Sequence, residues 1–167
     1  MFGYVFLGTA FGILLQQAGY GLPWALAGSL FIYAGSMQFV LVTFLSSGTA
    51  LTTAAVMTVL INGRHLFYGL SFVEKFKKMG KYYPYMIFSL TDETYSVLCS
   101  VKPEEGVDER KAMFLISLFD QSYWVLGSVL GSVLGQVMPL DFTGIDFSMT
   151  ALFVVIFLEQ WKDFPSH

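Results

Sequence analysis

The chain has 167 residues, of which 55% are hydrophobic and only 13% are charged, and its mean hydropathy is +0.63. Soluble proteins carry about 25% charged residues, so this composition excludes an ordinary soluble domain and indicates an all-α polytopic membrane protein. The net charge is −3, and the sequence has no stripe of basic residues that would neutralise phosphates. Nucleic acid is therefore excluded as a partner, and the lipid bilayer is the expected one.

Residues 1–63 contain no Asp, Glu, Lys or Arg, so the chain is expected to be embedded in lipid from its start. Residues 2–15 form a short apolar segment that ends at a Gly- and Pro-containing turn, which favours a partial or re-entrant helix. Because this segment lacks the basic region and cleavage site of a signal peptide, we expect it to be retained. Residues 22–45 are 24 uncharged residues and predict the clearest complete span.

The third segment, residues 50–73, is apolar but is interrupted by Asn62-Gly63-Arg64-His65, which predicts a break in the helix. Four lysines follow it within residues 75–81, and the positive-inside rule places them on the cytoplasmic side. The fourth segment, residues 82–101, carries Asp92 and Glu93 at its middle. The polar loop 102–111, with four acidic and three basic residues, is expected on the outer side.

Two further segments complete the prediction of about five to six transmembrane helices at ~20 residues each, in a single transmembrane domain over residues 1–167. Residues 112–138 form a long, glycine-spaced helix that carries Asp120, and Pro139 ends it. Residues 147–158 are apolar but short for a span. A loose similarity between residues 11–39 and 134–161 suggests a weak internal repeat, as many secondary transporters have.

The acidic pair within the fourth segment is the first candidate for a functional site. Insertion scales give a cost of about 2.5 to 3.5 kcal/mol for one acidic residue at the bilayer centre. Asp92 and Glu93 are therefore expected to face protein or water and to have a cationic partner. The alternative is an interfacial hairpin in which both carboxylates are simply hydrated.

Arg64 is the complementary cation, and we expect it to pair with Asp92 or Glu93. A guanidinium holds a carboxylate through two parallel hydrogen bonds, so Arg64 could bind a substrate carboxylate when the internal pair opens. The alternative for Arg64 is snorkelling toward the nearby lysines. His65 is a candidate carrier of a coupling proton or, alternatively, a hydrogen-bonded structural residue.

Three uncharged residues are secondary candidates for the substrate or ion path. Asn62 marks the predicted break, since non-helical backbone at membrane depth survives where it is buried or lines a cavity. Gln38 lies among small residues and suits recognition of an amino or carboxyl group, or an interhelical hydrogen bond. Tyr68 is the third. Neither a metal site nor a disulfide is expected, because Cys99 is the single cysteine.

Glycines at every fourth position predict close helix packing. Gly127, Gly131 and Gly135 lie on one helical face, and Gly8 and Gly12 form a second face of the same kind. Such faces allow backbones to approach closely, either within the chain or against a partner.

Four motifs together resemble the AzlC family, the large subunit of branched-chain amino acid exporters. They are Phe11-Gly12, Ala34-Gly35-Ser36-Met37-Gln38-Phe39, Ile61-Asn62-Gly63-Arg64-His65-Leu66-Phe67-Tyr68-Gly69 and Leu90-Thr91-Asp92-Glu93-Thr94, and Tyr123-Trp124 with Gly127 and Gly131 extends the similarity. The resemblance implies a multi-pass protein of the cell inner membrane. It also implies proton-linked export of valine, leucine, isoleucine and methionine with a small hydrophobic AzlD-like subunit. Family members run longer at both ends, so the chain resembles a shortened form.

Two other classes of function are kept open by the residues themselves. One is a non-transporting membrane scaffold or regulatory subunit, and the other, less favoured, is an intramembrane enzyme. The chain contains no GxSxG, HExxH or GxGD signature, so we expect no enzyme activity and no cofactor. Assembly into a homo-oligomer is left open.

Overall fold

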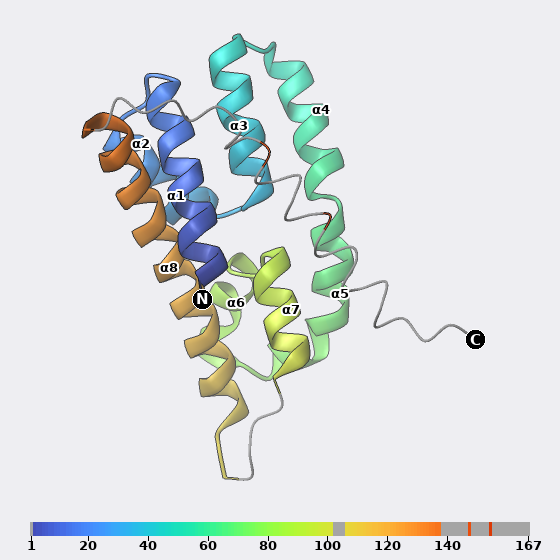
Figure 1. Cartoon of the computed structure of the whole chain (residues 1–167). Helices are drawn as coiled ribbons and strands as arrows, with labels where there is room; N and C mark the ends of the chain where they lie inside the picture. The colour runs from blue at the N-terminus through green and yellow to red at the C-terminus, as the bar shows by residue number, and fades with distance from the viewer. Residues whose placement is uncertain (1, 102–105, 138–146, 148–153, 155–167) are drawn as a thin grey trace.

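The computed structural model describes residues 2–101 and 106–137, together with residues 147 and 154 (Figure 1). These residues form helices and turns without any strand. Apart from residues 147 and 154, the sixth predicted segment lies outside the described residues, as does most of the second copy of the weak repeat. In chain order the elements are α1 (Phe2–Gln17), α2 (Leu22–Ala27), a π-helical turn η1 (Gly28–Ile32), α3 (Ser36–Ser47), α4 (Leu51–Asn62), α5 (Arg64–Lys77), a 3₁₀ turn η2 (Gly80–Tyr82), α6 (Tyr83–Phe88), α7 (Asp92–Ser100) and α8 (Glu109–Val137).

Helix α8 is the backbone of the arrangement. It has 29 residues and is the one helix among those described that is both long and apolar enough to cross a membrane. At 1.5 Å per residue its length is about 43 Å, which exceeds the hydrocarbon core of a bilayer. Helix α1 runs parallel to the upper half of α8 (Figure 1).

Glycines bring α1 and α8 into backbone contact. A Cβ added at Gly8 would lie 2.7 Å from the carbonyl oxygen of Trp124, so no larger side chain fits there. Gly12 meets the backbone of α8 one turn further along, and Gly131 meets the backbone of α1 at Thr9. Beside this seam, the buried Trp124 ring stacks on Phe11 at a centroid distance of 6.2 Å. The glycine faces therefore pack against each other within one chain.

The predicted complete span over residues 22–45 is wrong, because the helix breaks at its middle. Tyr33 adopts a left-handed conformation with φ of 40°, and Gly35 has φ of 40° and ψ of −103°. The Tyr33 N–H bonds to the carbonyl of Gly28, which closes the wide π-helical turn and ends the first half. Figure 1 shows α2 descending to mid-depth and α3 returning to the upper end. Residues 22–47 therefore form a half-helix hairpin.

In the third segment, residues 50–73, the helix is interrupted at one residue and not at the four residues 62–65 that the sequence predicts. Only Gly63 separates α4 from α5, and its backbone is itself helical, with φ of −54° and ψ of −29°. The Leu66 N–H bonds to the Gly63 carbonyl at 3.2 Å. The two helices consequently follow each other almost in line from the upper end to the lower end (Figure 1).

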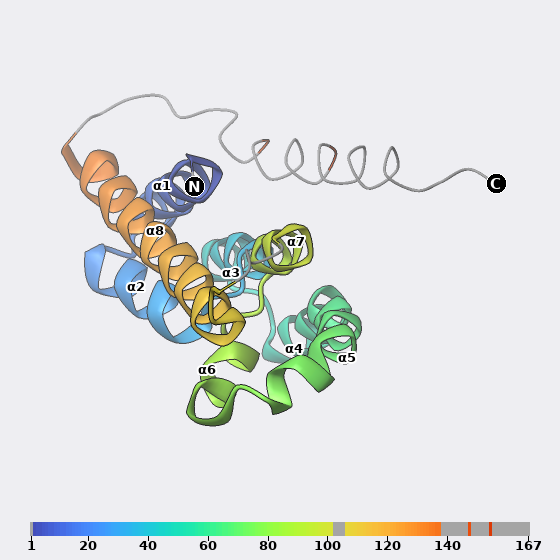
Figure 2. The ribbon, with the colours of Figure 1, turned by 90° about the horizontal axis from the view of Figure 1, so that it is seen from below.

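The fourth predicted segment, residues 82–101, is also broken. Helix α6 ends at Phe88, residues 89–91 are non-helical, and α7 begins at Asp92. Figure 1 shows both halves in the lower part of the molecule, opposite the first hairpin. Seen from below, α3 and α7 lie between the α1–α8 pair and the α4–α5 rod (Figure 2). Two half-helix hairpins thus enter from opposite ends and meet near the middle.

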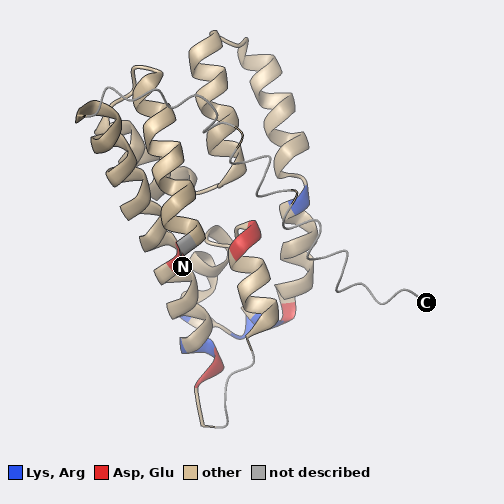
Figure 3. Ribbon diagram, in the orientation of Figure 1, with Lys and Arg blue, Asp and Glu red and all other residues tan. Residues whose placement is uncertain are grey.

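The second hairpin reverses the predicted side of the polar loop. Because α7 returns to the lower end, α8 begins beside the end of α5, and Lys75 Nζ lies 3.3 Å from the Glu109 carboxylate. The described part of the loop, from Gly106 onward, therefore lies at the same end as the lysines, and its predicted outer position is wrong. Figure 3 shows charged residues at this end and at mid-depth, with none in the upper half of the described chain.

Candidate functional site

An ion pair and a hydrogen bond join the first residues of three helices, α3, α5 and α7, at mid-depth. Arg64, the first residue of α5, has its guanidinium 2.7 Å from the carboxylate of Asp92, the first residue of α7. The same guanidinium nitrogen donates a hydrogen bond to the hydroxyl of Ser36, the first residue of α3. The side chains are 27% and 11% exposed, so the pair is largely shielded from solvent. One cation therefore ties both hairpins to the α4–α5 rod.

The helix break explains why two acids are tolerated at this depth. Thr91 caps α7 by accepting the backbone N–H of Thr94 at 3.3 Å, and Asp92 and Glu93 occupy the first turn. The first turn of a helix carries unpaired N–H groups and the positive end of the helix dipole, which stabilise carboxylates. The acids thus lie at a helix N-terminus and not in the interior of a continuous helix.

Arg64 forms its direct ion pair with Asp92, and its charge acts on the Glu93 carboxyl group only at longer range. A Cβ added at Gly35 would lie 3.8 Å from a Glu93 carboxylate oxygen, which places the acid against the break of the first hairpin. Among the ion pairs of the described residues, Glu93 takes part in none. The two adjacent acids therefore face different neighbours: Asp92 faces α5, and Glu93 faces the break between η1 and α3.

Gln38 lies inside the first hairpin and not at the ion pair. Its side chain is completely buried, and its amide nitrogen would lie 3.4 Å from a Cβ at Gly28, beside the ring of Phe11. Neither amide atom has a hydrogen-bond partner among the described residues. A buried unpaired amide is costly, so this position invites a ligand or a rearrangement.

Tyr68 holds α5 against α7. Its ring stacks on Tyr95 at a centroid distance of 4.4 Å and meets the His65 ring edge-on at 5.8 Å. His65 Nδ1 lies 3.1 Å from the backbone oxygen of Asn62, within hydrogen-bond distance. The side chains of His65, Tyr68 and Tyr95 therefore form a connected wall beside Arg64.

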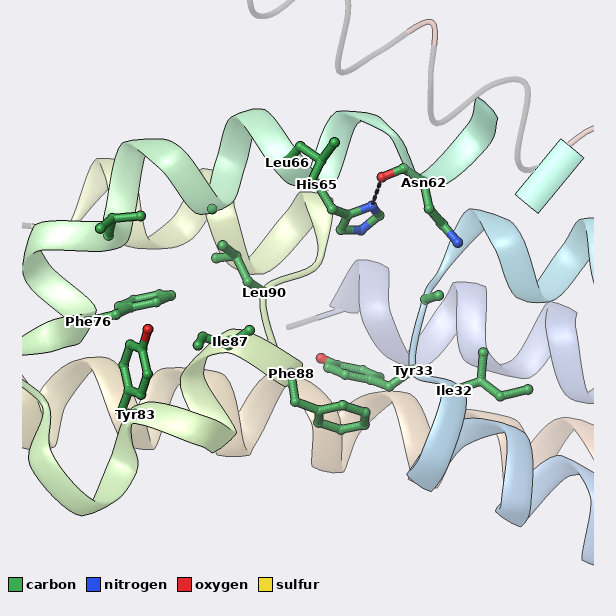
Figure 4. A pocket seen from close by; sticks show the side chains of 13 residues that line it. Ile32, Tyr33, Asn62, His65, Leu66, Phe76, Tyr83, Ile87, Phe88 and Leu90 are labelled. Carbon is green, nitrogen blue, oxygen red and sulfur yellow. Dashed lines mark hydrogen bonds between the residues drawn. The ribbon is translucent and has the colours of Figure 1, made fainter. Parts of the chain in front are cut away.

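A cavity of about 490 Å³ lies next to this wall (Figure 4). Ligand sites typically enclose about 300 to 1,000 Å³, so the cavity can hold a small molecule. Asn62 and His65 supply polar groups on one side, while the break at Tyr33 and helix α6 supply the other side. The rest of the lining is mainly apolar: Ile32, Leu66, Val73, Phe76, Ile87, Phe88 and Leu90. Arg64, Asp92, Glu93, Gln38 and Tyr68 do not line it.

A third acid, with a hydroxyl network, lies on the other side of the junction. Asp120 of α8 is 6% exposed and accepts a hydrogen bond from the Thr94 hydroxyl at 3.2 Å. Tyr4 of α1 joins the hydroxyls of Thr94 and Thr91 at 2.9 and 2.7 Å. The sequence marks Asp120 by its position within an apolar helix, but nothing local marks Tyr4 as a neighbour of residues about ninety positions away.

Comparisons with known proteins identify the family of the chain. The family model described as AzlC protein matches residues 1–138. A Helicobacter pylori protein named an uncharacterized membrane protein is 43% identical over 167 residues, which cover all of this chain and 73% of that protein. The Bacillus subtilis branched-chain amino acid transport protein AzlC is 38% identical over 99% of this chain and 65% of its own length. The Escherichia coli inner membrane protein YgaZ is 28% identical over 95% of this chain and 68% of its length. No solved structure matches the chain.

Proposed function

Because the chain belongs to the AzlC family, we propose that it is a multi-pass inner-membrane component of a branched-chain amino acid exporter. Its cargo would be valine, leucine, isoleucine and methionine, and its movement would be coupled to protons. The observation that carries this proposal is the meeting of two half-helix hairpins at the Arg64–Asp92 pair, beside a largely apolar cavity. Transporters commonly bind their cargo where discontinuous helices meet near the bilayer midplane.

The ion pair and the cavity together match the two parts of a branched-chain amino acid. The cargo is a zwitterion with an apolar side chain. Its carboxylate would replace Asp92 on the guanidinium of Arg64, and its ammonium group would replace Arg64 on Asp92. The side chain would enter the cavity past Leu66 and Ile87. The exchange keeps the charge balance of the site unchanged while the internal pair opens.

The remaining candidates support this exchange. Asn62 and His65 present hydrogen-bonding groups on the cavity wall, and His65 is a second candidate for a proton carrier. Tyr68 keeps α5 in register with α7 through its stack on Tyr95. Gln38 has two unpaired amide atoms that would gain partners when the first hairpin shifts.

Proton coupling is supported by the imbalance of charge at mid-depth. Asp92, Glu93 and Asp120 are three carboxyl groups, whereas Arg64 is the single basic side chain that pairs with any of them in the described chain. A buried carboxylate without a cation is very costly, so taking up and releasing protons is a natural role for these groups.

A small hydrophobic AzlD-like subunit would find an apolar surface on α4 that the described residues leave exposed. This helix has no buried residue, and its apolar side chains include Leu51 and Val59, which are 85% and 72% exposed. In a membrane such a surface meets lipid or another helix. The proposal is that the partner packs along the α4–α5 rod.

The direct test is efflux of labelled amino acids from liposomes that contain the purified chain, with and without the small subunit. We expect efflux of leucine, valine and isoleucine but not of glutamate or lysine, because the cavity lining is mainly apolar. Absence of leucine efflux in both preparations would contradict transport. Equal efflux of glutamate would contradict the assigned cargo class.

Filling the cavity gives a sharper test of the site. Gly69 lines the cavity, and a Cβ added there meets nothing within 4 Å, so the side chain in Gly69→Leu starts in open space. We expect leucine efflux to fall by about tenfold or more, equivalent to at least ~1.4 kcal/mol of lost binding. Thermal stability should stay within about 0.5 kcal/mol. Gly3→Leu is the matched control, since Gly3 is exposed, also has open space and lies outside the cavity.

A further inference from the structure

A continuous chain of hydroxyl groups connects the acid of α8 to the start of α7. Thr94 donates to the Asp120 carboxylate, Tyr4 links Thr94 to Thr91, and Thr91 also contacts Thr94 directly at 3.2 Å. Glu93 follows Thr91 by two residues in the first turn of α7, so its carboxyl group lies next to the Thr91 end of this network. Three elements, α1, α7 and α8, therefore contribute to one hydroxyl network that runs from the Asp120 carboxyl group to Thr91, beside Glu93.

The surroundings of Asp120 are polar but contain no ion pair. The titratable groups that act on it include the phenols of Tyr4 from α1, Tyr33 from the first break and Tyr85 from α6, together with the charge of the N-terminal amino group. Within the described chain no basic side chain forms an ion pair with Asp120. The next residue, Gln121, accepts a hydrogen bond at its amide oxygen from the Tyr85 hydroxyl at 2.8 Å. The Asp120 carboxyl group is thus connected through hydroxyl groups to the start of α7, the helix that carries Asp92 and Glu93.

We propose that Glu93, Thr91, Tyr4, Thr94 and Asp120 form a proton relay, in which Asp120 stores the proton that Glu93 exchanges with the transport path. This inference rests on the proposed transport function and assigns its coupling route. A hydroxyl can donate and accept at the same time, which a relay requires. Chains of acidic side chains within membrane proteins commonly carry protons.

The transfer balances at each group. The Glu93 carboxyl proton passes to the Thr91 oxygen, and Thr91 passes its own hydroxyl proton to Tyr4. Tyr4 then passes its proton to Thr94, and Thr94 passes its proton to the Asp120 carboxylate. Each hydroxyl ends with one proton, Glu93 ends ionised, and Asp120 ends protonated. The reverse sequence restores the starting state, so no other reactant is needed.

The experiment measures proton movement and amino acid exchange separately in the same liposomes. A pH-sensitive dye inside the vesicles reports protons that move with leucine, and leucine-for-leucine counterflow reports exchange that moves no net proton. For Asp120→Asn we expect leucine-driven proton movement to fall by about tenfold or more, with counterflow reduced less than about twofold. The exposed acid Asp108 provides the matched control, Asp108→Asn, which should change neither signal.

A second pair of variants tests the path independently of the acid. Thr94→Val removes the central hydroxyl and should abolish proton movement, whereas Thr94→Ser keeps the hydroxyl and should retain it. Thr58→Val is the control for the loss of a threonine hydroxyl, because among the described residues Thr58 donates only to the carbonyl of Ala54 in its own helix. If Asp120→Asn fails to fold, this pair alone decides the question.

The outcomes separate the relay from the function on which it rests. Wild-type counterflow without proton movement, or full proton movement in Asp120→Asn or Thr94→Val, would overturn the relay and leave amino acid transport standing. Absence of any leucine flux in the wild-type protein would overturn both. Loss of proton movement with retained counterflow in Asp120→Asn and Thr94→Val, together with recovery in Thr94→Ser, is the result that the relay requires.

Discussion

The α1–α8 pair and the junction of the two hairpins lie side by side, but they are held together by opposite means. Between α1 and α8 the backbones themselves touch through Gly8, Gly12 and Gly131, without any charged group in the contact. At the junction an ion pair, hydroxyl groups and helix ends make the contacts, and a cavity remains beside them. Close backbone packing has little freedom to rearrange, whereas polar contacts can exchange partners. We therefore infer that the α1–α8 pair is a fixed frame and that the junction of the two hairpins is the moving part.

The largest effect on stability is expected where the backbones of α1 and α8 approach each other most closely, at Gly131. A Cβ at Gly131 would run into the backbone of Thr9, which no side-chain movement can relieve. We expect Gly131→Val to lower the free energy of unfolding by more than about 4 kcal/mol, seen as a lost or strongly lowered melting transition in detergent.

Gly135 on the same helix is the control for this substitution. A Cβ there would lie 3.2 Å from the Cβ of Gln16 and 3.4 Å from the Cα of Ile13, a tight contact that a small shift between the helices relieves. Gly135→Ala should therefore shift the free energy of unfolding by about 1 kcal/mol or less. Similar losses in both variants would show that the pair is not held by backbone contact at Gly131.

The same contrast explains which parts the sequence could predict. Glycines every fourth residue report a helix face directly, because the spacing depends only on helical periodicity. The break at Tyr33 has no such local signal, since the 24 residues around it are all uncharged and long enough to span. Tyr33 is instead held by distant neighbours, such as Phe88, whose ring lies 6.3 Å away. Its left-handed backbone is a property of the tertiary fold.

The misplaced polar loop follows from the same cause. Counting one crossing for each apolar segment assumes that each segment changes sides. A half-helix hairpin returns to the end from which it entered, so in the second hairpin α7 leads back to the lower end, where α5 ends with its lysines. The acidic pair was still found from the sequence, because the cost of intramembrane charge is independent of topology.

An intermediate effect is expected at the ion pair. Arg64→Gln leaves the Asp92 carboxylate without its cation, and breaking a buried pair typically costs about 3 to 5 kcal/mol. The partial exposure of this pair reduces the expected loss to about 2 to 3 kcal/mol. Leucine efflux should be lost as well, because the proposed carboxylate partner is gone.

The double variant Arg64→Gln with Asp92→Asn separates stability from transport. Removing both charges relieves the unpaired acid, so melting should return toward the wild-type temperature while efflux stays absent. Arg64→Lys keeps the charge but loses the planar fork, and it should fold better than Arg64→Gln and transport poorly. Normal efflux in the double variant would show that the junction does not handle the cargo.

The smallest effect is expected at the lower end, where Lys75 of α5 meets Glu109 of α8 across the boundary between frame and moving part. Both side chains are more than half exposed, and exposed pairs contribute about 0 to 1 kcal/mol. In a double-mutant cycle of Lys75→Gln and Glu109→Gln, measured by thermal unfolding, we expect a coupling of about 0.5 kcal/mol or less, falling further at high salt. A coupling as large as that of the Arg64–Asp92 pair would mean that the two regions are joined at the base, and the base would then have to open during transport. A weak coupling would mean that the lower end does not fix the α4–α5 rod in place. Arg64 would then be the main polar link between the rod and the second hairpin, and an exchange of partners with the cargo would break that link.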